Sequence, residues 1–350
     1  MPQATLASLT TLRLGGPLGT VLDLSDLSDL ADWRDAARTI STREQNGPLV
    51  LGHGSNVIAA DAGHPGTVVV MNTRGITAQR LTGTTVAVTV QAGHPLTDLV
   101  QWAAAERLAG IECLAGIPGT VGAAPVQNAG AYGRQIADTL HSVTVWDWDM
   151  GRLRTFPVQA CRLRYRDSRF KRSPGRWTVL SATLHLTRTP AAPITYRPLA
   201  DELGVPVGER PPVPEVTAAV LANRRRRGLL LDPNGPDPRQ VGSVFLNPRI
   251  SATQAALWSD QGCPVHRDSD GNLRASAGWL LELVACRPGL PVADGVRCSE
   301  RRTLTVTAHG EVTAAAFDRA LADLAARVAT TTGIDLQPEP TRVGQWAARA

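Results

Sequence analysis

The segment from Ile117 to Gly133, with the sequence IPGTVGAAPVQNAGAYG, constrains the fold of this chain more than any other segment. Its apolar residues follow neither the helical nor the strand period, so we expect irregular backbone here. A solvent-facing glycine-rich loop is the simplest interpretation, but Ile117, Val121 and Val126 make the segment too apolar for one. Irregular backbone of this length inside a compact domain is usually functional. Because the side chains are small, main-chain N–H and C=O groups are free to meet the polar edge of a flat heterocycle.

Regular elements are predicted on both sides of this segment. Apolar periodicity and capping residues predict helices at 25–40, 96–110, 214–227, 276–285 and 312–332, and a strand at 303–307. Two β-branched runs, 48–52 and 67–71, flank a glycine-rich turn and predict a strand–loop–strand unit. The proline-rich stretch 205–214 is typical of a linker, so the elements beyond it are expected to form a second unit of mixed α+β type.

Composition limits the classes of protein to which this chain can belong. With 350 residues, 43% of them hydrophobic, the chain can bury a full core, and its length indicates two or three domains. No apolar run is long enough to span a bilayer and no secretory leader is recognisable, so we expect a cytoplasmic protein with no membrane partner. The five cysteines are scattered and form no CxxC pair, which indicates neither a disulfide framework nor a metal site.

The basic charge is best explained by a small anionic ligand. The formal net charge is +5, but the single dense basic run, Arg224 to Arg227, adjoins a helical pattern and lacks interleaved aromatic residues. We therefore expect no nucleic acid as a partner. Lys171 is the only lysine, so this chain uses arginine almost wherever a cation is needed.

The turn Gly52-His53-Gly54-Ser55-Asn56 is a first candidate site. Two glycines one residue apart after a strand permit close approach of a pyrophosphate, and Ser55 and Asn56 supply hydrogen bonds. The turn is not a Rossmann fingerprint, because Val57 stands where the third glycine belongs and a strand follows. Taken alone, such a turn is more often a tight loop.

Three further segments carry polar residues that, taken alone, indicate only ordinary structural roles. In Tyr165-Arg166-Asp167-Ser168, an arginine beside an acid is by default a surface ion pair. Ser243 follows a glycine within 241–248, where a serine usually caps a turn. Glu339 lies between two prolines after the final predicted helix and indicates nothing alone.

Taken in order, these segments resemble the UDP-N-acetylenolpyruvoylglucosamine reductases, flavoenzymes of peptidoglycan precursor synthesis. The resemblance runs nearly end to end, through TTLRLGG at 10–16, LGHGSN, AGIPGTVGAAPVQNAGAYG, YRDSRFK, GSVFLNP, ASAGWLLE at 275–282 and PEPTRVG at 338–344. IPGTVGAAPVQNAGAYG and YRDS are highly specific for the family, whereas the GHGSN turn is shared with the wider group of FAD enzymes of the vanillyl-alcohol-oxidase-like fold. Tyr196, in ITYRPLADELG, resembles the nucleotide-contacting tyrosine of the longer, first type of this reductase.

The resemblance implies an α+β protein with a two-part FAD-binding module and a C-terminal α+β substrate-binding domain. Its expected parts are 1–73, joined by the tail 340–350, then 74–214, and the substrate domain 215–339. It implies a monomer with non-covalently bound FAD, NADPH as co-substrate, and UDP-N-acetylglucosamine enolpyruvate as the substrate that is reduced to UDP-N-acetylmuramate.

The resemblance also assigns roles to residues. Arg166 and Glu339 match the groups around the substrate carboxylate and developing enolate, and Ser243 matches the proton donor. The positions matched to cofactor binding are Gly52, His53, Gly54, Ser55, Asn56, Gly116, Ile117, Pro118, Gly119, Thr120, Gly122, Ala123, Gln127, Asn128, Gly130 and Ala131. Those matched to substrate binding are Tyr132, Tyr196, Arg227, Asn247 and Glu282, where Arg227 replaces the usual phosphate-binding lysine.

The chain departs from the family pattern at a few positions, which leaves two alternatives open. His53 replaces a small or acidic residue, and Val244 and Leu246 replace a phenylalanine and a frequent lysine. One alternative is a sugar or alcohol oxidase on the same scaffold, with flavin attached to His53. The other is a non-catalytic paralogue that binds flavin or a UDP-sugar, although none of the matched catalytic residues is lost.

Overall fold

The computed structural model describes residues 4–25 and 47–347. They form two compact units, each described by itself: unit 1 is Met1–Gly19, Gly54–Pro65 and Leu231–Ala350, and unit 2 is Thr20–His53 and Gly66–Leu230. Most of the helix predicted at 25–40 lies outside the described residues. Among the residues that are described, no helix has the length and apolar character needed to cross a membrane.

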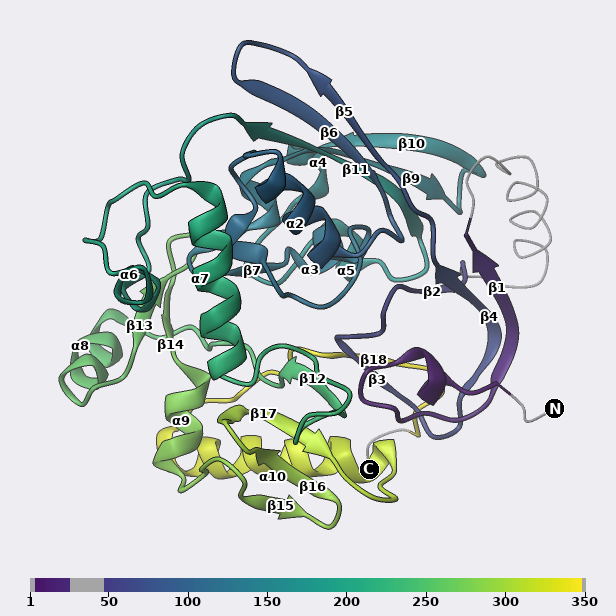
Figure 1. Ribbon diagram of the computed structural model, residues 1–350. Helices are drawn as coiled ribbons and strands as arrows, with labels where there is room; N and C mark the ends of the chain where they lie inside the picture. The colour runs from purple at the N-terminus through teal and green to yellow at the C-terminus, as the bar shows by residue number, and fades with distance from the viewer. Residues whose placement is uncertain (1–3, 26–46, 348–350) are drawn as a thin grey trace. The chain divides into compact units, whose positions relative to one another are not determined.

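Unit 2 is built on a five-stranded antiparallel sheet (Figure 1). Its order is β10 (Arg152–Pro157), β9 (Leu140–Asp147), β11 (Trp177–Thr187), β6 (Thr85–Gln91) and β5 (Ile76–Arg80). A second sheet has the order β1 (Leu18–Leu24), β4 (His64–Met71) and β2 (Leu49–Leu51), with β2 parallel to β4. Its other elements are α2 (Leu96–Ala105), η2 (Glu112–Leu114), α3 (Ala123–Gln127), β7 (Gly130–Ala131), β8 (Arg134–Gln135), η3 (Ile136–Asp138), α4 (Val158–Cys161), α5 (Arg169–Arg172), α6 (Arg197–Leu203) and α7 (Val213–Arg226).

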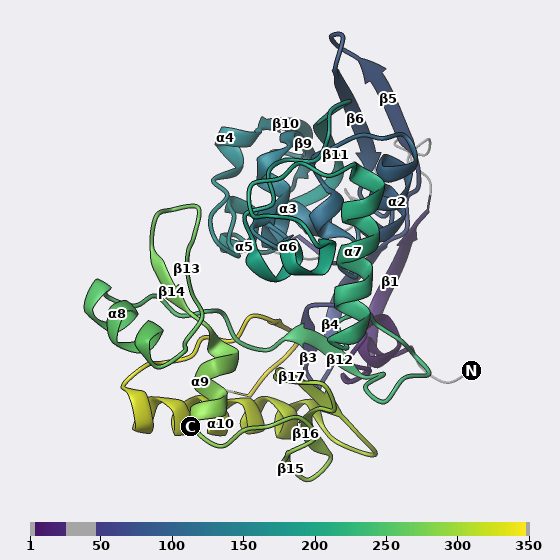
Figure 2. The ribbon, with the colours of Figure 1, turned by 60° about the vertical axis from the view of Figure 1, so that its left-hand side comes forward.

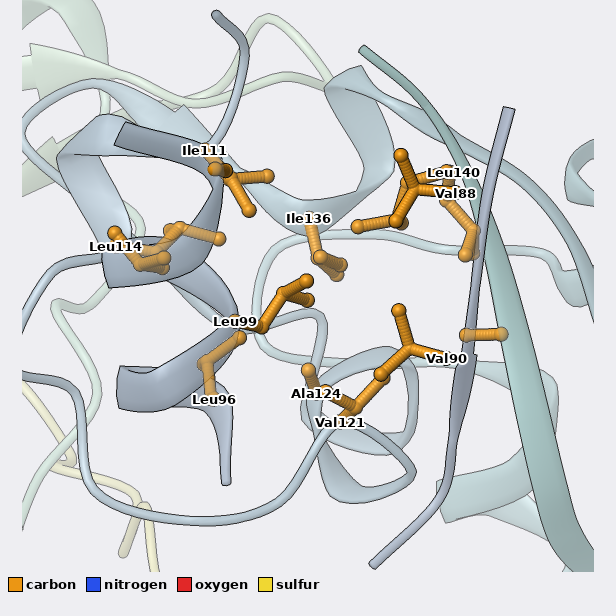
Figure 3. Packing of buried hydrophobic residues seen from close by; sticks show 14 of the residues in the cluster. Val88, Val90, Leu96, Leu99, Ile111, Leu114, Val121, Ala124, Ile136 and Leu140 are labelled. Atoms are coloured by element: carbon orange, nitrogen blue, oxygen red, sulfur yellow. The ribbon is translucent and has the colours of Figure 1, made fainter. Parts of the chain in front are cut away.

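The glycine-rich segment takes part in the core of unit 2. Alternate residues of β6, including Val88 and Val90, are fully buried, as expected for a strand with one face covered. Figure 3 shows these valines together with Leu99 of α2 and with Val121 and Ala124 of the glycine-rich segment. Burial of those apolar side chains therefore fixes the position of this segment against the sheet.

Unit 1 contains a four-stranded antiparallel sheet covered by helices. Its order is β12 (Gln240–Ser243), β17 (Arg302–Ala308), β16 (Val296–Ser299) and β15 (Pro291–Ala293), and Figure 1 shows α10 (Ala314–Thr332) lying along it. Its other elements are η1 (Leu6–Leu9), α8 (Ala252–Asp260), α9 (Ala277–Leu283), the hairpin β13 (Val265–Arg267) and β14 (Leu273–Ala275), and the parallel pair β3 (Val57–Ala59) and β18 (Thr341–Val343). Figure 2 shows α8 beside the β13–β14 hairpin.

Helix α10 illustrates how the sequence encodes its ends. Thr313 caps the first turn by accepting from the N–H of Ala316 at 3.1 Å, and Asp61 accepts from the N–H groups of Ala314 and Ala315 at 2.7 and 2.9 Å. Gly333 ends the helix in the left-handed conformation with φ of +71°.

The structure confirms the strand at 303–307 and the helices at 214–227, 276–285 and 312–332 to within a few residues. The helix predicted at 96–110 is too long, because α2 ends at Ala105 and Arg107 already has φ of +54°. The fully irregular backbone predicted for 117–133 is also wrong in part: α3 is one helical turn there, too short to show a period. The strand predicted directly after the turn 52–56 is confirmed as β3, but its pairing with β18, near the other end of the chain, was not predicted.

The proline-rich stretch 205–214 connects α6 to α7, and both helices belong to unit 2. By packing, the change of unit comes later, between Leu230 and Leu231. The three-part division into 1–73, 74–214 and 215–339 stays a prediction.

Candidate functional site

The turn from Gly52 to Asn56 connects β2 to β3, and neighbouring chain fills the space beside its glycines. Gly54 has φ of +57°, and a Cβ atom there would lie 2.2 Å from the main-chain oxygen of Leu9. A Cβ on Gly52 would lie 2.4 Å from Oγ1 of Thr120. Both glycines are therefore required by loop-to-loop packing, and a ligand would meet the main chain of the turn.

A second histidine, outside every sequence motif, accompanies His53. Burial, followed by the charge of Arg74, lowers the pKa of His53. Burial also lowers the pKa of His94, against the opposing effect of Asp98. Within the described part of the chain, Nδ1 and Nε2 of His94 are both shielded from solvent and have no hydrogen-bond partner. Buried polar atoms are rarely left unpaired, so the His94 ring indicates a place for a ligand or a bound water.

The loop from Gly116 to Gly122 is fixed to the junction of β6 and α2, where His94 lies. Val121 donates to the main-chain oxygen of His94 at 2.9 Å, and the Gly119 oxygen accepts from Leu96 at 3.0 Å. Thr120 is 2% exposed. Thr120 also lies beside Gly52, so the end of β2 and the loop 116–122 are neighbours within unit 2.

The guanidinium of Arg166 is held by the second half of the glycine-rich segment. Its Nη1 and Nη2 donate to the main-chain oxygens of Asn128 and Gly130 at 3.2 and 2.5 Å. Arg166 itself adopts φ of +52°, in a tight turn closed between Arg164 and Asp167. The neighbouring carboxylate of Asp167 pairs with Arg172 at 3.0 Å.

Two further bonds tie the same motif to the same segment. Ser168 donates to the main-chain oxygen of Val126 at 2.8 Å and caps α5 by accepting from Lys171 N at 3.0 Å. The Lys171 ammonium donates to Oε1 of Gln127 at 2.7 Å. The two most family-specific motifs therefore form one structural cluster, which their separation in sequence did not reveal.

Tyr132 and Tyr196 also lie together in unit 2. Their rings pack edge to face with centroids 5.6 Å apart, and the Tyr132 hydroxyl donates to Oδ1 of Asn223 on α7 at 3.0 Å. Burial raises the pKa of Tyr132, while the charges of Arg224 and Arg227 act to lower it. Arg227 directly follows α7 and belongs to the same unit as Tyr132.

Arg224 is a site residue that our sequence analysis missed. It is 8% exposed on the inner face of α7, and its Nη2 donates to the oxygen of Leu229 at 3.0 Å. In the sequence Arg224 is part of the basic run 224–227, but Val216, Val220 and Asn223 are buried at helical spacing and place Arg224 on the same face. That period was the signal that could have identified it.

Ser243 and Glu339 are brought together within unit 1. Ser243 ends β12, and the next residue, Val244, accepts a hydrogen bond from Glu339 N at 3.0 Å. Leu246 donates to the oxygen of Gln337 at 2.9 Å, so 243–246 and 337–339 lie side by side as extended chains.

The turn at Asn56 is bonded to the same residues. Thr341 N donates to the Asn56 oxygen at 2.9 Å, and Asn56 Nδ2 donates to the Glu339 oxygen at 3.5 Å. Three predicted site segments, at 56, 243 and 339, therefore form one group in unit 1.

Asn247 and Glu282 are held by different partners in unit 1. Oδ1 of Asn247 accepts from Ala277 N at 2.9 Å, at the start of α9, and its main-chain oxygen accepts from Arg274 at 2.7 Å. Oε1 of Glu282, an exposed residue of α9, accepts from Thr303 Oγ1 at 3.3 Å. The Asn247 amide is therefore fixed in orientation, which suits a ligand contact.

The described residues thus fall into two groups of predicted site residues. Unit 2 holds Gly52, His53, Gly116, Ile117, Pro118, Gly119, Thr120, Gly122, Ala123, Gln127, Asn128, Gly130, Ala131, Tyr132, Arg166, Tyr196 and Arg227, and unit 1 holds Gly54, Ser55, Asn56, Ser243, Asn247, Glu282 and Glu339. Within each unit these residues gather in the clusters described above.

The fold and these clusters define an FAD-binding protein: the model of the FAD binding domain matches residues 28–156. The model of the UDP-N-acetylenolpyruvoylglucosamine reductase C-terminal domain matches residues 234–343. These matches confirm the predicted α+β architecture of an FAD-binding module followed by a C-terminal domain.

Known relatives identify the family. The chain is 38% identical to the UDP-N-acetylenolpyruvoylglucosamine reductase of Thermobifida fusca, over 97% of this chain and 96% of that protein. It is 38% identical to the enzyme of the same name from Salinispora arenicola, over 97% and 94%. The crystal structure of UDP-N-acetylenolpyruvylglucosamine reductase (MurB) from Thermus caldophilus shares the fold, with a TM-score of 0.62, 24% identity and 97% coverage of both chains. The chain belongs to the UDP-N-acetylenolpyruvoylglucosamine reductase family.

The described residues fit an FAD molecule on two observations. The His94 ring and Arg224 Nε are buried polar groups without partners, and both adjoin the loop 116–122. A Cβ atom on Gly52 or on Gly54 would meet neighbouring chain, so the main chain of this turn is held in a fixed position.

Proposed function

We propose that this chain is an FAD-dependent reductase that converts UDP-N-acetylglucosamine enolpyruvate to UDP-N-acetylmuramate with NADPH, in peptidoglycan precursor synthesis. The observation that carries the proposal is the match to reductases of one name over 97% of the chain, with Arg166, Ser243 and Glu339 all present. Residues 52–56, 116–123 and 127–131 would hold FAD, which would supply the hydride chemistry, through N5, between NADPH and the terminal enolpyruvyl carbon.

Arg166 is proposed to hold the substrate carboxylate and the enolate charge that develops beside it. Its guanidinium is already oriented by the oxygens of Asn128 and Gly130. A preorganised cation stabilises developing charge without reorganisation during the reaction. Glu339, whose main chain is fixed against Val244, is proposed to complete the polar clamp.

Ser243 is proposed to donate the proton to the carbon that bears the carboxylate. A serine hydroxyl is a weak acid, so it donates only to a strongly basic centre with cationic help nearby. Ser243 is the last residue of β12. It directly follows Gly242, which has φ of +74° and no heavy atom near the place of a Cβ.

The remaining residues are proposed to bind the two ligands. Arg227 takes the UDP phosphates, with Tyr132, Tyr196, Asn247 and Glu282 as further substrate contacts. Residues 52–56, 116–123 and 127–131 hold FAD non-covalently.

An anaerobic titration of the purified yellow protein tests the proposal. NADPH should bleach the bound flavin, and subsequent UDP-N-acetylglucosamine enolpyruvate should restore its colour stoichiometrically. Flavin that NADPH does not bleach, or that the enolpyruvyl substrate does not reoxidise, contradicts the proposal.

One observation keeps the oxidase alternative in view: His53 lies within the proposed cofactor turn, and burial lowers its pKa, which favours the neutral imidazole. Acid precipitation separates the two functions. Flavin released into the supernatant supports the reductase, whereas flavin that stays with the precipitate, together with rapid reoxidation by O2, supports the oxidase.

A further inference from the structure

Lys171 is an exception in a chain that otherwise uses arginine. Of the 36 lysine and arginine residues in the sequence, every one except Lys171 is an arginine. A lysine at this position therefore calls for a local reason. An ammonium directs its donors from a single nitrogen atom, whereas the donors of a guanidinium are spread over a planar fork. The contacts of Lys171 are of the first kind.

Nζ of Lys171 connects two segments that are distant in sequence. It donates to Oε1 of Gln127 at 2.7 Å and to the main-chain oxygen of Arg166 at 3.2 Å. Gln127 ends α3 and Lys171 lies in α5, and these two short helices are neighbours in unit 2 (Figure 1). The ammonium therefore joins the glycine-rich segment to the turn that carries Arg166.

The main chain of Arg166 requires support of this kind. Its φ of +52° lies in the left-handed region, which residues with a side chain rarely adopt. Such a conformation persists only where the surrounding structure holds it. The bond from Lys171 is made to the carbonyl oxygen of this residue itself, while the guanidinium is held by the oxygens of Asn128 and Gly130.

These bonds close a ring through both segments. Lys171 bonds to Gln127, the next residue Asn128 accepts from Nη1 of Arg166, and the Arg166 oxygen accepts from Lys171. Ser168 adds a second connection, because it donates to the oxygen of Val126 and accepts from the N–H of Lys171. A displacement of the ammonium is therefore transmitted to the turn and to the guanidinium together.

We propose that Lys171 is a positioning residue for Arg166, which it keeps directed at the carboxylate of the substrate; this inference rests on the proposed function. A cation stabilises developing charge best when it does not have to reorganise during the reaction. Without the ammonium, the turn is released and the guanidinium loses its fixed direction. The step that suffers is reduction of the enolpyruvyl substrate, whereas reduction of the flavin by NADPH does not depend on this carboxylate contact.

The test is a double-mutant cycle on flavin reoxidation, measured at saturating UDP-N-acetylglucosamine enolpyruvate. Lys171→Met, which removes the charge and the donors, should slow reoxidation about 10- to 100-fold, the effect of a lost hydrogen bond that involves a charged group. In an Arg166→Gln protein the same change should add about twofold or less, because residues that act through one another are not additive. Flavin reduction by NADPH should stay nearly intact in Lys171→Met.

Two further variants separate geometry from charge. Lys171→Arg keeps the charge but spreads the donors, so its reoxidation should stay about tenfold slow. Arg172→Met is the matched control, since Arg172 is an exposed cation on the same helix and pairs with Asp167. It should change reoxidation by about twofold or less. The inference is overturned by equal slowing with and without Arg166, by an unchanged rate in Lys171→Met, or by full activity of Lys171→Arg.

A measurement on the unmodified protein does not depend on the folding of any variant. Because Lys171 is the only lysine, protein labelled with ¹⁵N at the lysine side chain gives a single ammonium signal in NMR spectra. Protons that are held in hydrogen bonds exchange with water slowly. The ammonium of the protein should therefore exchange much more slowly than that of the amino acid lysine measured alongside, and equally fast exchange overturns the inference.

These outcomes are distinguishable from failure of the proposed function. Flavin that NADPH does not reduce in the unmodified protein, or that the enolpyruvyl substrate does not reoxidise, contradicts the reductase itself. Normal turnover of the unmodified protein, together with reoxidation that is insensitive to Lys171, contradicts this inference alone.

Discussion

Nη1 of Arg166 donates to the main-chain oxygen of Asn128 at 3.2 Å, and Asn128 in turn has a left-handed backbone with φ of +46°. The side chain of Asn128 fixes that conformation, because its Nδ2 donates to the oxygen of Arg164 at 2.8 Å and to Oε1 of Gln135 at 2.9 Å. The guanidinium of Arg166 is thus oriented by the same glycine-rich segment that is matched to cofactor binding. A change in either segment should disturb the other.

Ser243→Ala should separate the two half-reactions. Loss of a general acid typically slows the step it serves by about 100- to 10,000-fold, so flavin reoxidation by the enolpyruvyl substrate should slow by that order. Flavin reduction by NADPH needs no proton from Ser243 and should remain nearly intact. Stopped-flow measurement of each half-reaction checks this, with Ser243→Cys as a variant that keeps a proton donor. Equal damage to both half-reactions would refute the role.

Arg227→Ala should mainly raise the concentration of UDP-sugar that is required for half-maximal activity. A charge-assisted hydrogen bond to phosphate contributes about 1.5–3 kcal/mol, so the KM for the UDP-sugar should rise about 10- to 100-fold with kcat less affected. Arg225→Ala is the control, since Arg225 is exposed on the same helix. An unchanged affinity for the UDP-sugar removes Arg227 from the phosphate site.

Gly54→Ala should destabilise the protein far more than Gly151→Ala. The two glycines have nearly the same φ, +57° and +58°, but a Cβ at 54 meets the Leu9 oxygen at 2.2 Å whereas a Cβ at 151 meets nothing within 4 Å. Backbone strain alone costs about 1–2 kcal/mol, and overpacking adds about 1–3 kcal/mol at position 54. Urea unfolding of both variants measures the difference, and similar midpoints would contradict the packing role of Gly54.

The stabilising contribution of Asp268 to unit 1 should be lost in acid. Although its burial acts to raise its pKa, hydrogen bonds from Arg274 and Asn272 lower the pKa below its ordinary value of 3.8. The unfolded chain therefore binds the proton more readily, so this stabilisation is present above about pH 4 and is lost as the pH falls through the folded pKa.

Asp268→Asn tests this contribution. Breaking a buried ion pair costs about 3–5 kcal/mol at neutral pH, and the deficit relative to the unmodified protein should shrink in acid. Asp270→Asn, an exposed neighbour, should show neither effect. Unfolding midpoints of both proteins at pH 7 and pH 3.5 measure this deficit in stability. A deficit that does not depend on pH would disprove the assignment.

Sequence patterns were sufficient where a feature is local or belongs to a specific motif. The helix 312–332 and its end at Gly333 needed only the printed chain, whereas the roles of Arg166, Ser243 and Glu339 come from the family resemblance and stay predictions. Features made by long-range contact were not accessible. The strand β3 pairs with residues 341–343, and the two orphaned groups, on His94 and Arg224, become conspicuous only once burial is known.

The parallel pairing of β3 with β18 has a consequence for synthesis of the protein. Residues 57–59 cannot find their partner until residues 341–343 have left the ribosome, whereas the sheet of β5, β6, β9, β10 and β11 is complete once residue 187 has emerged. Domains generally fold as units during translation. The Asn56 turn therefore gains its bond to Thr341 only after the five-stranded sheet of unit 2 is complete.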